Sequence, residues 1–269
     1  MPELPEVETT LRAIEKFKNS SIKEVKIHNR NLRWKVDTKF ESLLANQKII
    51  NLDRRAKYII FYLDNINIIL HLGMSGSLRI ANNKENYFLK HDHAEFIFEN
   101  ERIIYNDPRR FGSLHITNNI DEHRLICNLG PEPLSGDFNK NQLFELCKNS
   151  KTNIKSLIMN QKNVVGIGNI YASESLFLSS VDPSKNASQL NIDDCDRIVK
   201  ASKKILNAAI KVGGTTLKDF YSADGSPGYF KFKLNVYGRE GLECKNCKKE
   251  ILKININKRA TFFCSSCQG

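Results

Sequence analysis

The first three residues of the chain, Met1-Pro2-Glu3, carry groups that could act together as a nucleophile and an acid. Because the second residue is small, we expect Met1 to be removed, which would leave Pro2 with a free secondary amine. Such an amine condenses with an aldehyde to a Schiff base, and its pKa of about 7.7–8.0 keeps part of it neutral near pH 7. Glu3 is a potential proton donor beside it. Proline followed by glutamate is also a common helix start, so these residues alone leave the chemistry open.

Four of the seven cysteines form two pairs near the C-terminus, Cys244-x2-Cys247 and Cys264-x2-Cys267. Each C-x-x-C places two sulfurs on one tight turn, and two such turns complete a tetrahedral site with no position left for catalysis. Two disulfides are the alternative. The other three cysteines are scattered, which favours a reducing cytosol over a secreted disulfide framework. The spacing therefore predicts one structural Zn²⁺.

The chain is basic, with 41 Lys+Arg against 30 Asp+Glu, a formal net charge of +11 and a pI near 9.3. Such a balance is typical of proteins that bind a polyanion, most often nucleic acid, although a merely soluble basic protein is the alternative. The N-terminus has no apolar segment of the signal-peptide type. The longest apolar run, Tyr58–Leu63, is far shorter than the roughly 20 residues of a membrane-spanning helix. We expect a cytoplasmic protein without a membrane partner.

The first half of the chain must position the N-terminus. Its pattern of apolar residues predicts one short helix followed by strands. Val7, Leu11 and Ile14 have helical spacing, which predicts a helix that ends near Phe17. The segment 22–116 contains alternating and continuous apolar runs separated by polar turns, which predicts a β-sandwich or barrel. The expected strands include 58–63 and 66–70, both buried on two faces, and 94–98, 103–105 and 113–116.

The second half has a helical pattern that begins after the turn-rich segment Leu129–Pro133. The expected helices are Phe138–Cys147, Ile154–Gln161, Asn169–Ser179 and Asp193–Val212. Gly213-Gly214 is a typical helix end. Ser222–Gly228 lacks periodicity and is expected to be a mobile loop. Short strands at Leu234–Tyr237 and Ile251–Ile256 are expected to flank the first cysteine pair.

Ten sequence blocks in one order resemble bacterial formamidopyrimidine-DNA glycosylase over the full length. The blocks are MPELPEVET, RRAKY (54–58), HLGMSGSLR (71–79), KHDHAE (90–95), DPRRFG (107–112), LGPEPL (129–134), GIGNIYASE (166–174), GGTTLKDF (213–220), VYGREG (236–241) and RATFFC (259–264). The resemblance implies an α+β multidomain fold. Its expected parts are an N-terminal catalytic β-sandwich (1–118), a helix-two-turn-helix domain with a lesion-recognition loop (119–233) and a C-terminal zinc ribbon (234–269).

The resemblance also implies a reaction. The chain would act as a monomer on double-stranded DNA that contains a damaged base, remove oxidised purines and then cleave the strand by β,δ-elimination. Pro2 would attack C1′ and form the Schiff base, and Glu3 would be the acid/base. Lys57 would support proton transfer during strand cleavage, although a solvated strand-edge lysine is the ordinary alternative. Arg259 would hold the lesion phosphate and take part in the second elimination.

Further residues match DNA-contacting positions of the family. Met74, Arg109 and Phe111 match the trio that fills the gap left by the extruded nucleotide, whereas Met74 and Phe111 taken alone would be interpreted as core residues. His91, Lys151 and Asn169 match phosphate contacts. Since Asn149-Ser150 replace a longer basic run before Lys151, Lys155 could share that contact. The backbone N–H groups of 166–168, before a helix, are also expected to meet a phosphate.

Two other functions remain open. The related endonuclease VIII type prefers oxidised pyrimidines. Such chains typically have Gly at the position of Leu4. Their wedge, the residues that fill the gap left by the extruded nucleotide, also differs from the DPRRFG block of this chain. A non-catalytic zinc-ribbon DNA-binding module would explain the charge and the cysteines. It would not need Pro2, Glu3, Lys57 and Arg259 together.

Overall fold

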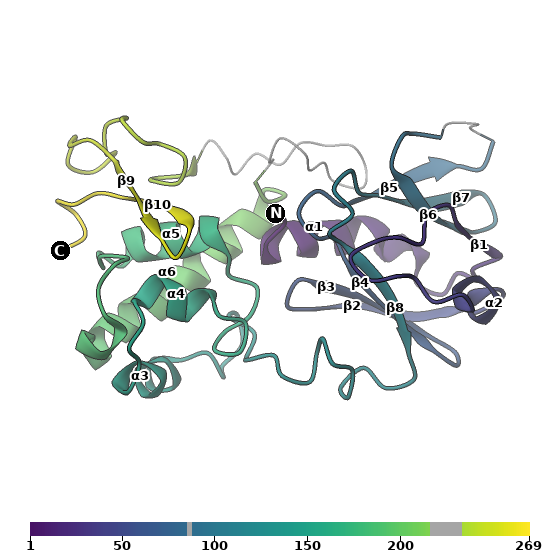
Figure 1. Cartoon of the computed structure of the whole chain (residues 1–269), viewed down its shortest axis with the longest axis horizontal. Helices are drawn as coiled ribbons and strands as arrows, with labels where there is room; N and C mark the ends of the chain where they lie inside the picture. Colours follow the sequence, from purple (N-terminus) through teal and green to yellow (C-terminus); the bar gives the residue numbers. More distant parts are fainter. Residues whose placement is uncertain (85–87, 216–232) are drawn as a thin grey trace. The chain divides into compact units, whose positions relative to one another are not determined.

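The computed structural model describes residues 1–84, 88–215 and 233–269, which form two compact units (Figure 1). The first unit comprises Met1–Cys127 together with residues 212–215. The second comprises Asn128–Lys211 and the described residues from Lys233 on. The expected mobile loop at 222–228 lies outside the described residues.

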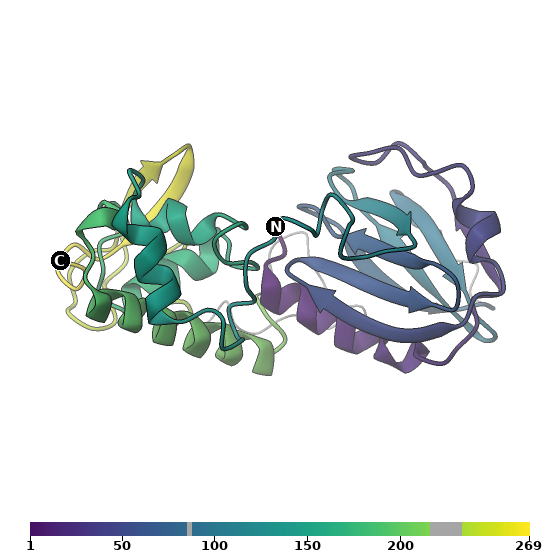
Figure 2. The ribbon, with the colours of Figure 1, turned by 90° about the horizontal axis from the view of Figure 1, so that it is seen from below.

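The first unit contains two antiparallel sheets of four strands each, and Figure 2 shows these strands with the N-terminal helix beside them. One sheet has the order β1-β6-β7-β5 and the other the order β2-β3-β4-β8. The bounds are β1 Glu24–Ile27, β2 Ile49–Arg55, β3 Tyr58–Leu63, β4 Asn67–His71, β5 Ser77–Asn82, β6 Asp92–Ile97, β7 Glu101–Asn106 and β8 Ser113–Thr117, with α2 Phe40–Leu44 before β2. Phe61 of one sheet stacks on Phe96 of the other in a shared core, so the fold is a sandwich.

The N-terminal helix α1, Leu4–Ile14, packs against β2, β3 and β5 and continues as a 3-10 turn, Glu15–Phe17. Its apolar side chains Leu4, Val7 and Ile14 are buried, as the helical spacing predicts. A proline in the first turn and a glutamate at the third helical position start the helix. The sandwich therefore fixes α1, and with it the residues that directly precede this helix.

The second unit contains four α-helices within its described part, at nearly the predicted positions. They are α3 Lys140–Lys148, α4 Ile154–Met159, α5 Asn169–Leu178 and α6 Ile192–Lys211. Asparagine side chains cap α3 and α4: Asn139 accepts from two backbone N–H groups of α3, and Asn153 accepts from the backbone N–H of Ser156. No helix in the described ranges is both long and apolar enough to cross a bilayer.

The hairpin of β9, Leu252–Ile256, and β10, Arg259–Phe263, confirms the expected strand near 251–256. The strand predicted at Leu234–Tyr237 is wrong. The backbone N–H groups of Asn235, Val236 and Tyr237 all donate to the buried carboxylate of Glu174 on α5, at 2.9–3.1 Å. A partner in α5 thus takes the donors that a neighbouring strand would need, and the segment forms turns instead.

Candidate active site and metal centre

Pro2 and Glu3 lie at the start of α1 and are both buried, with Glu3 only 2% exposed. The carboxylate of Glu6 holds this end of the chain. Its Oε2 accepts from the backbone N–H of Glu3 at 2.8 Å, and its Oε1 accepts from that of Thr215 at 2.8 Å. Gly214 has φ +76°, and a Cβ there would lie 2.9 Å from Oε1 of Glu6. The nucleophile and acid candidates are therefore adjacent and held by one buried carboxylate.

Lys57 lies in the tight turn between β2 and β3, and the residue is 7% exposed rather than solvated. Arg54 fixes this turn to α1: its Nε donates to Oε2 of Glu8 at 2.9 Å and its Nη1 to the carbonyl of Ala56 at 3.0 Å. Burial raises the pKa of Glu8, but hydrogen bonds and charges from Arg54 and Arg12 outweigh it, so the pKa is lowered. The positions of Lys57 and of the N-terminus thus depend on the same helix.

Met74, Arg109 and Phe111 come together around a cavity of about 690 Å³. Met74 is 38% exposed and Phe111 45% exposed, and the Arg109 guanidinium lies 5.1 Å from the centre of the Phe111 ring. The apolar character of Met74 and Phe111 taken alone predicts core positions, and that prediction is wrong. Two exposed apolar side chains beside a guanidinium suit insertion between bases.

Asn31, Arg33 and His71 line the same cavity and were not singled out from the sequence. Burial, together with the positive charges of Lys57 and Arg33, lowers the pKa of His71 to about 4. Its Nδ1 accepts from the backbone N–H of Gly73 at 3.0 Å, which places the proton of the neutral ring on Nε2. His71 is the last residue of β4 and lies three residues before Met74. This closeness in sequence is the signal by which His71 can be predicted to lie near Met74. Arg33 lies in a loop without periodicity.

His91 directly precedes β6 with a left-handed φ of 77°. Two backbone contacts hold this turn: the carbonyl of His91 accepts from the backbone N–H of Asp107 at 3.1 Å, and that of Lys90 accepts from Nδ2 of Asn106 at 3.1 Å. The imidazole is therefore presented from a fixed backbone.

Arg259 is exposed at the first residue of β10 in the second unit. It follows the two-residue turn Asn257-Lys258, in which both residues have positive φ, as a tight hairpin turn requires. Nδ2 of Asn257 donates to Oγ of Ser156 at 2.8 Å, so the turn is joined to α4. A cavity of about 230 Å³ lies between Arg259 and α4.

Lys155 is 1% exposed, so a phosphate contact shared with the exposed Lys151 would have to form from a buried position. Its Nζ donates to Oδ1 of Asn169 and to Oγ1 of Thr261, both at 2.6 Å. Nδ2 of Asn169 in turn donates to the carbonyl of Ala260 at 2.8 Å. Lys155 and Asn169 therefore join α4 and α5 to the strand that carries Arg259, while Lys151 is exposed.

The phosphate site expected at the backbone N–H groups of 166–168, before α5, offers fewer donors than the sequence predicts. The backbone N–H of Gly166 donates to Oε1 of Gln161 at 2.9 Å, and that of Ile167 donates to the carbonyl of Val165 at 2.9 Å. These two groups already have partners within the chain, so the expectation fails for them.

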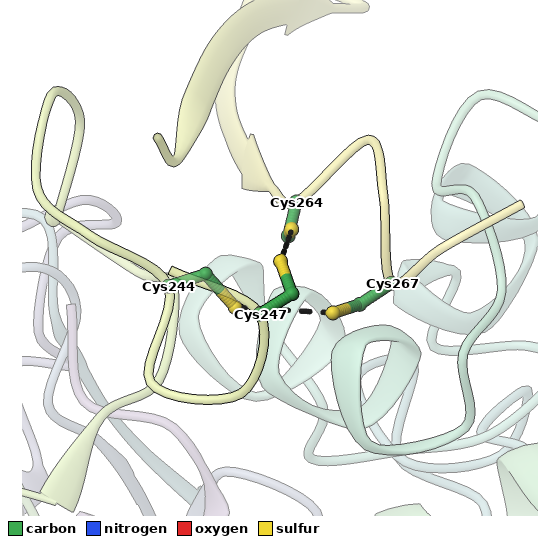
Figure 3. Close-up of side chains that lie close together, drawn as sticks. All are labelled: Cys244, Cys247, Cys264 and Cys267. Atoms are coloured by element: carbon green, nitrogen blue, oxygen red, sulfur yellow. Dashed lines mark hydrogen bonds between the residues drawn. The ribbon is translucent and has the colours of Figure 1, made fainter. Parts of the chain in front are cut away.

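The four cysteine sulfurs of the two C-x-x-C pairs lie within 4.8 Å of one another (Figure 3). The Sγ atoms of Cys247 and Cys264 are 3.4 Å apart, and those of Cys244 and Cys267 are 3.9 Å apart. Within the described residues, this cluster of ligands consists of these four cysteines. Four thiols from two tight turns fit a tetrahedral metal ion, and the donor set is the one that zinc prefers.

The chain is similar to known proteins over its whole length. The models of the formamidopyrimidine-DNA glycosylase N-terminal domain and H2TH domain match residues 1–114 and 129–221. A Hydrogenovibrio crunogenus formamidopyrimidine-DNA glycosylase is 48% identical, with 100% of this chain and 96% of the relative covered. Two structures of Lactococcus lactis Fpg, with N7-benzyl-Fapy-dG DNA and with abasic-site DNA, each have a TM-score of 0.92, 35% identity and 99% of both chains covered.

Proposed function

The chain belongs to the formamidopyrimidine-DNA glycosylase family, and from this membership we propose that it excises oxidised purines from double-stranded DNA and then cleaves the strand by β,δ-elimination. The observation that carries this proposal is the placement of Pro2 and Glu3 at the anchored start of α1. We further propose that a single chain acts on the DNA, with functional divisions at 1–118, 119–233 and 234–269. Lactococcus lactis Fpg was solved with N7-benzyl-Fapy-dG DNA and with abasic-site DNA, which supports damaged DNA as the substrate class.

The Pro2 nitrogen is the proposed nucleophile once Met1 has been removed. Met1 lines the cavity that Met74, Arg109 and Phe111 surround, so its loss would leave the nitrogen bonded to it at the cavity wall. The amine attacks C1′, the glycosidic bond breaks, and the base departs with the electron pair of that bond. Ring opening of the sugar, with the C1′–O4′ electron pair leaving on O4′, then gives an iminium ion, whose positive nitrogen acidifies the neighbouring C2′ proton for elimination.

Four other side chains would move protons, hold charge or donate to a phosphate. Glu3, the carboxyl group beside the nucleophile, supplies the proton that bond breakage requires. Lys57 assists the first elimination from its buried position after β2, and Arg259 holds the lesion phosphate and assists the second. The half-buried imidazole of His71 is neutral, because burial and the positive charges of Lys57 and Arg33 lower its pKa, and it offers its Nε2–H as a further phosphate donor.

DNA contacts would come from both units. Met74 and Phe111 fill the gap that the extruded nucleotide leaves, and the Arg109 guanidinium bonds the orphaned base. His91, Lys151 and Asn169 are proposed phosphate contacts, although the side chain of Asn169 is also committed to Lys155 and Ala260. Leu4 and the intact wedge favour purine over pyrimidine lesions. The buried Pro2, Glu3 and Lys57 favour an enzyme over a binding module.

We expect the Met1-free protein to release free 8-oxoguanine or formamidopyrimidine base from a duplex with one lesion, and to leave a one-nucleotide gap with phosphates at both ends. Mass spectrometry of the released base and gel analysis of the strand ends measure the two steps. An undamaged duplex is the control. Release of oxidised pyrimidines with no release of oxidised purines would contradict the proposed substrate class.

One structural zinc ion per chain is proposed for the four-thiol site. It would join the two cysteine turns and so hold the β9–β10 hairpin that carries Arg259. We expect Cys264→Ser to lower the zinc content to near zero and to weaken DNA binding about 10-fold or more, while the sandwich stays folded. Elemental analysis and DNA titration measure these effects, and Cys127→Ser, an exposed cysteine of the other unit, is the matched control. Fully active protein without zinc would contradict the proposal.

A further inference from the structure

The wedge residues lie on two separate loops of the first unit. Met74 lies between β4 and β5, whereas Arg109 and Phe111 lie between β7 and β8. The two loop backbones touch: a Cβ on Gly73 would lie 2.3 Å from the backbone nitrogen of Gly112 and 2.4 Å from the carbonyl carbon of Phe111. Such contact lets the loops form one wedge, but it does not by itself fix their register.

The carboxylate of Asp107, which is fully buried, binds both loops. Its Oδ1 accepts from Oγ of Ser75 at 2.7 Å, on the Met74 loop, and from the backbone N–H of Arg109 at 3.3 Å. Its Oδ2 accepts from the backbone N–H of Gly112 at 2.8 Å and from the hydroxyl of Tyr105 at 3.1 Å. The Ser75 hydroxyl also accepts from the Arg109 N–H at 3.1 Å, which closes the network between the loops.

The backbone of Asp107 extends the same network toward a proposed phosphate contact. Its N–H donates to the carbonyl of His91 at 3.1 Å, and its carbonyl accepts from Nε2 of His93 at 2.8 Å and from the N–H of Arg110 at 3.1 Å. One residue therefore touches the backbone or side chain of every loop that presents a wedge residue or His91.

A carboxylate is suited to this place because it only accepts hydrogen bonds, and these four donors all converge on its two oxygens. Hydrogen bonds to an ionised acceptor are roughly twice as strong as those between neutral groups. Burial and the Asp107 charge raise the pKa of Tyr105 well above its ordinary value, so the phenol remains a donor at physiological pH. The donor set thus requires an acceptor at both oxygens.

We propose that Asp107 is a positioning residue that holds the Met74 loop and the Arg109–Phe111 loop in the register needed for insertion into DNA. This inference rests on the proposed function. Asp107 does not touch the reacting atoms. It acts through Ser75 and Gly112, and its loss lets the two halves of the wedge move independently.

The test is Asp107→Asn, which keeps the shape but replaces one acceptor oxygen with an NH2 group. Whichever way the amide is oriented, that group faces a donor from one of the loops. We expect single-turnover excision of 8-oxoguanine to fall about 100-fold, since small misplacements of positioning groups cost that much. The fluorescence rise of 2-aminopurine placed beside the lesion, which reports the opened stack, is expected to be lost.

Schiff-base trapping on a preformed abasic site distinguishes a lost positioning role from a general loss of protein structure, because that site has no paired base to extrude. Trapping by Asp107→Asn is expected to stay within about 3-fold of the unchanged protein. Ser75→Ala, which removes only the side-chain link to the Met74 loop, is expected to show a weaker form of the same split. Glu95→Gln is the matched carboxylate-to-amide control, since Glu95 pairs with His28 and Arg102 instead.

Two results would overturn the inference. One is unchanged excision and an unchanged 2-aminopurine signal in Asp107→Asn. The other is an equal loss of excision and abasic-site trapping with a lowered melting temperature, which would assign Asp107 to stability alone. If the unchanged protein neither excises 8-oxoguanine nor traps on an abasic site, the proposed function has failed, and this outcome is distinct from both.

Discussion

A protein whose Pro2 nitrogen is blocked is expected to form no borohydride-stable complex with lesion DNA, whereas the Met1-free chain is trapped in good yield. A retained Met1 or an N-terminal tag makes that nitrogen an amide, which cannot condense with the opened sugar. The expected effect is complete loss of trapping and of strand cleavage, measured on a duplex with one 8-oxoguanine.

Pro2→Gly refines this experiment, because a glycine terminus still has a primary amine. Trapping is expected to survive at a reduced rate in that variant when its Met1 is removed, and to vanish when Met1 is kept. Circular dichroism checks that α1 remains folded in each protein. Efficient trapping by a chain with a blocked N-terminus would show that another amine reacts.

Glu3→Gln is expected to reduce base release by about 10²–10⁴-fold, the usual contribution of a positioned general acid. The amide keeps the shape of the side chain but cannot supply a proton as the glycosidic bond breaks. A preformed abasic site already exposes its aldehyde, so the same variant should still cleave it. Release of 8-oxoguanine and cleavage of abasic DNA are measured side by side.

Glu15→Gln is the matched control, since Glu15 is exposed just beyond the other end of α1. It is expected to leave both reactions unchanged. If Glu3→Gln lost abasic-site cleavage as completely as base release, a role in protonating the glycosidic bond would be wrong, and Glu3 would instead act on the imine or on folding.

Local patterns in the sequence predict most of the fold. Val7, Leu11 and Ile14 repeat at helical spacing, and the structure places α1 over them. The continuous run at 58–63 becomes β3, whose central residues Ile59 and Ile60 are almost fully buried on both faces of their sheet. These elements are predictable because the spacing of apolar residues that identifies a helix or a strand lies within a single segment.

The features that the sequence could not predict involve partners distant in the sequence. Leu234–Tyr237 has the composition of a strand, yet the Glu174 carboxylate takes its N–H groups. The buried position of Lys155 likewise depends on Asn169 and Thr261, to which its Nζ donates. Neither partner can be identified from the spacing around the residue, because tertiary contacts decide both outcomes.

The proposed site shows the same division. The cysteine turns could be identified from their spacing, because C-x-x-C is a local geometry. The exposure of Met74 and Phe111 follows from loops whose glycines and Asp107 are assembled only in the folded sandwich, so composition alone assigns them to the core. Arg33 joins the same cavity from a loop without any pattern.

The most direct test of the central claim is mass spectrometry of the borohydride-trapped complex after digestion with a protease and a nuclease. The account predicts that the reduced sugar is attached to the N-terminal peptide, with the mass increase on the nitrogen of Pro2. A sugar adduct on Lys57, or on any other lysine, would contradict it.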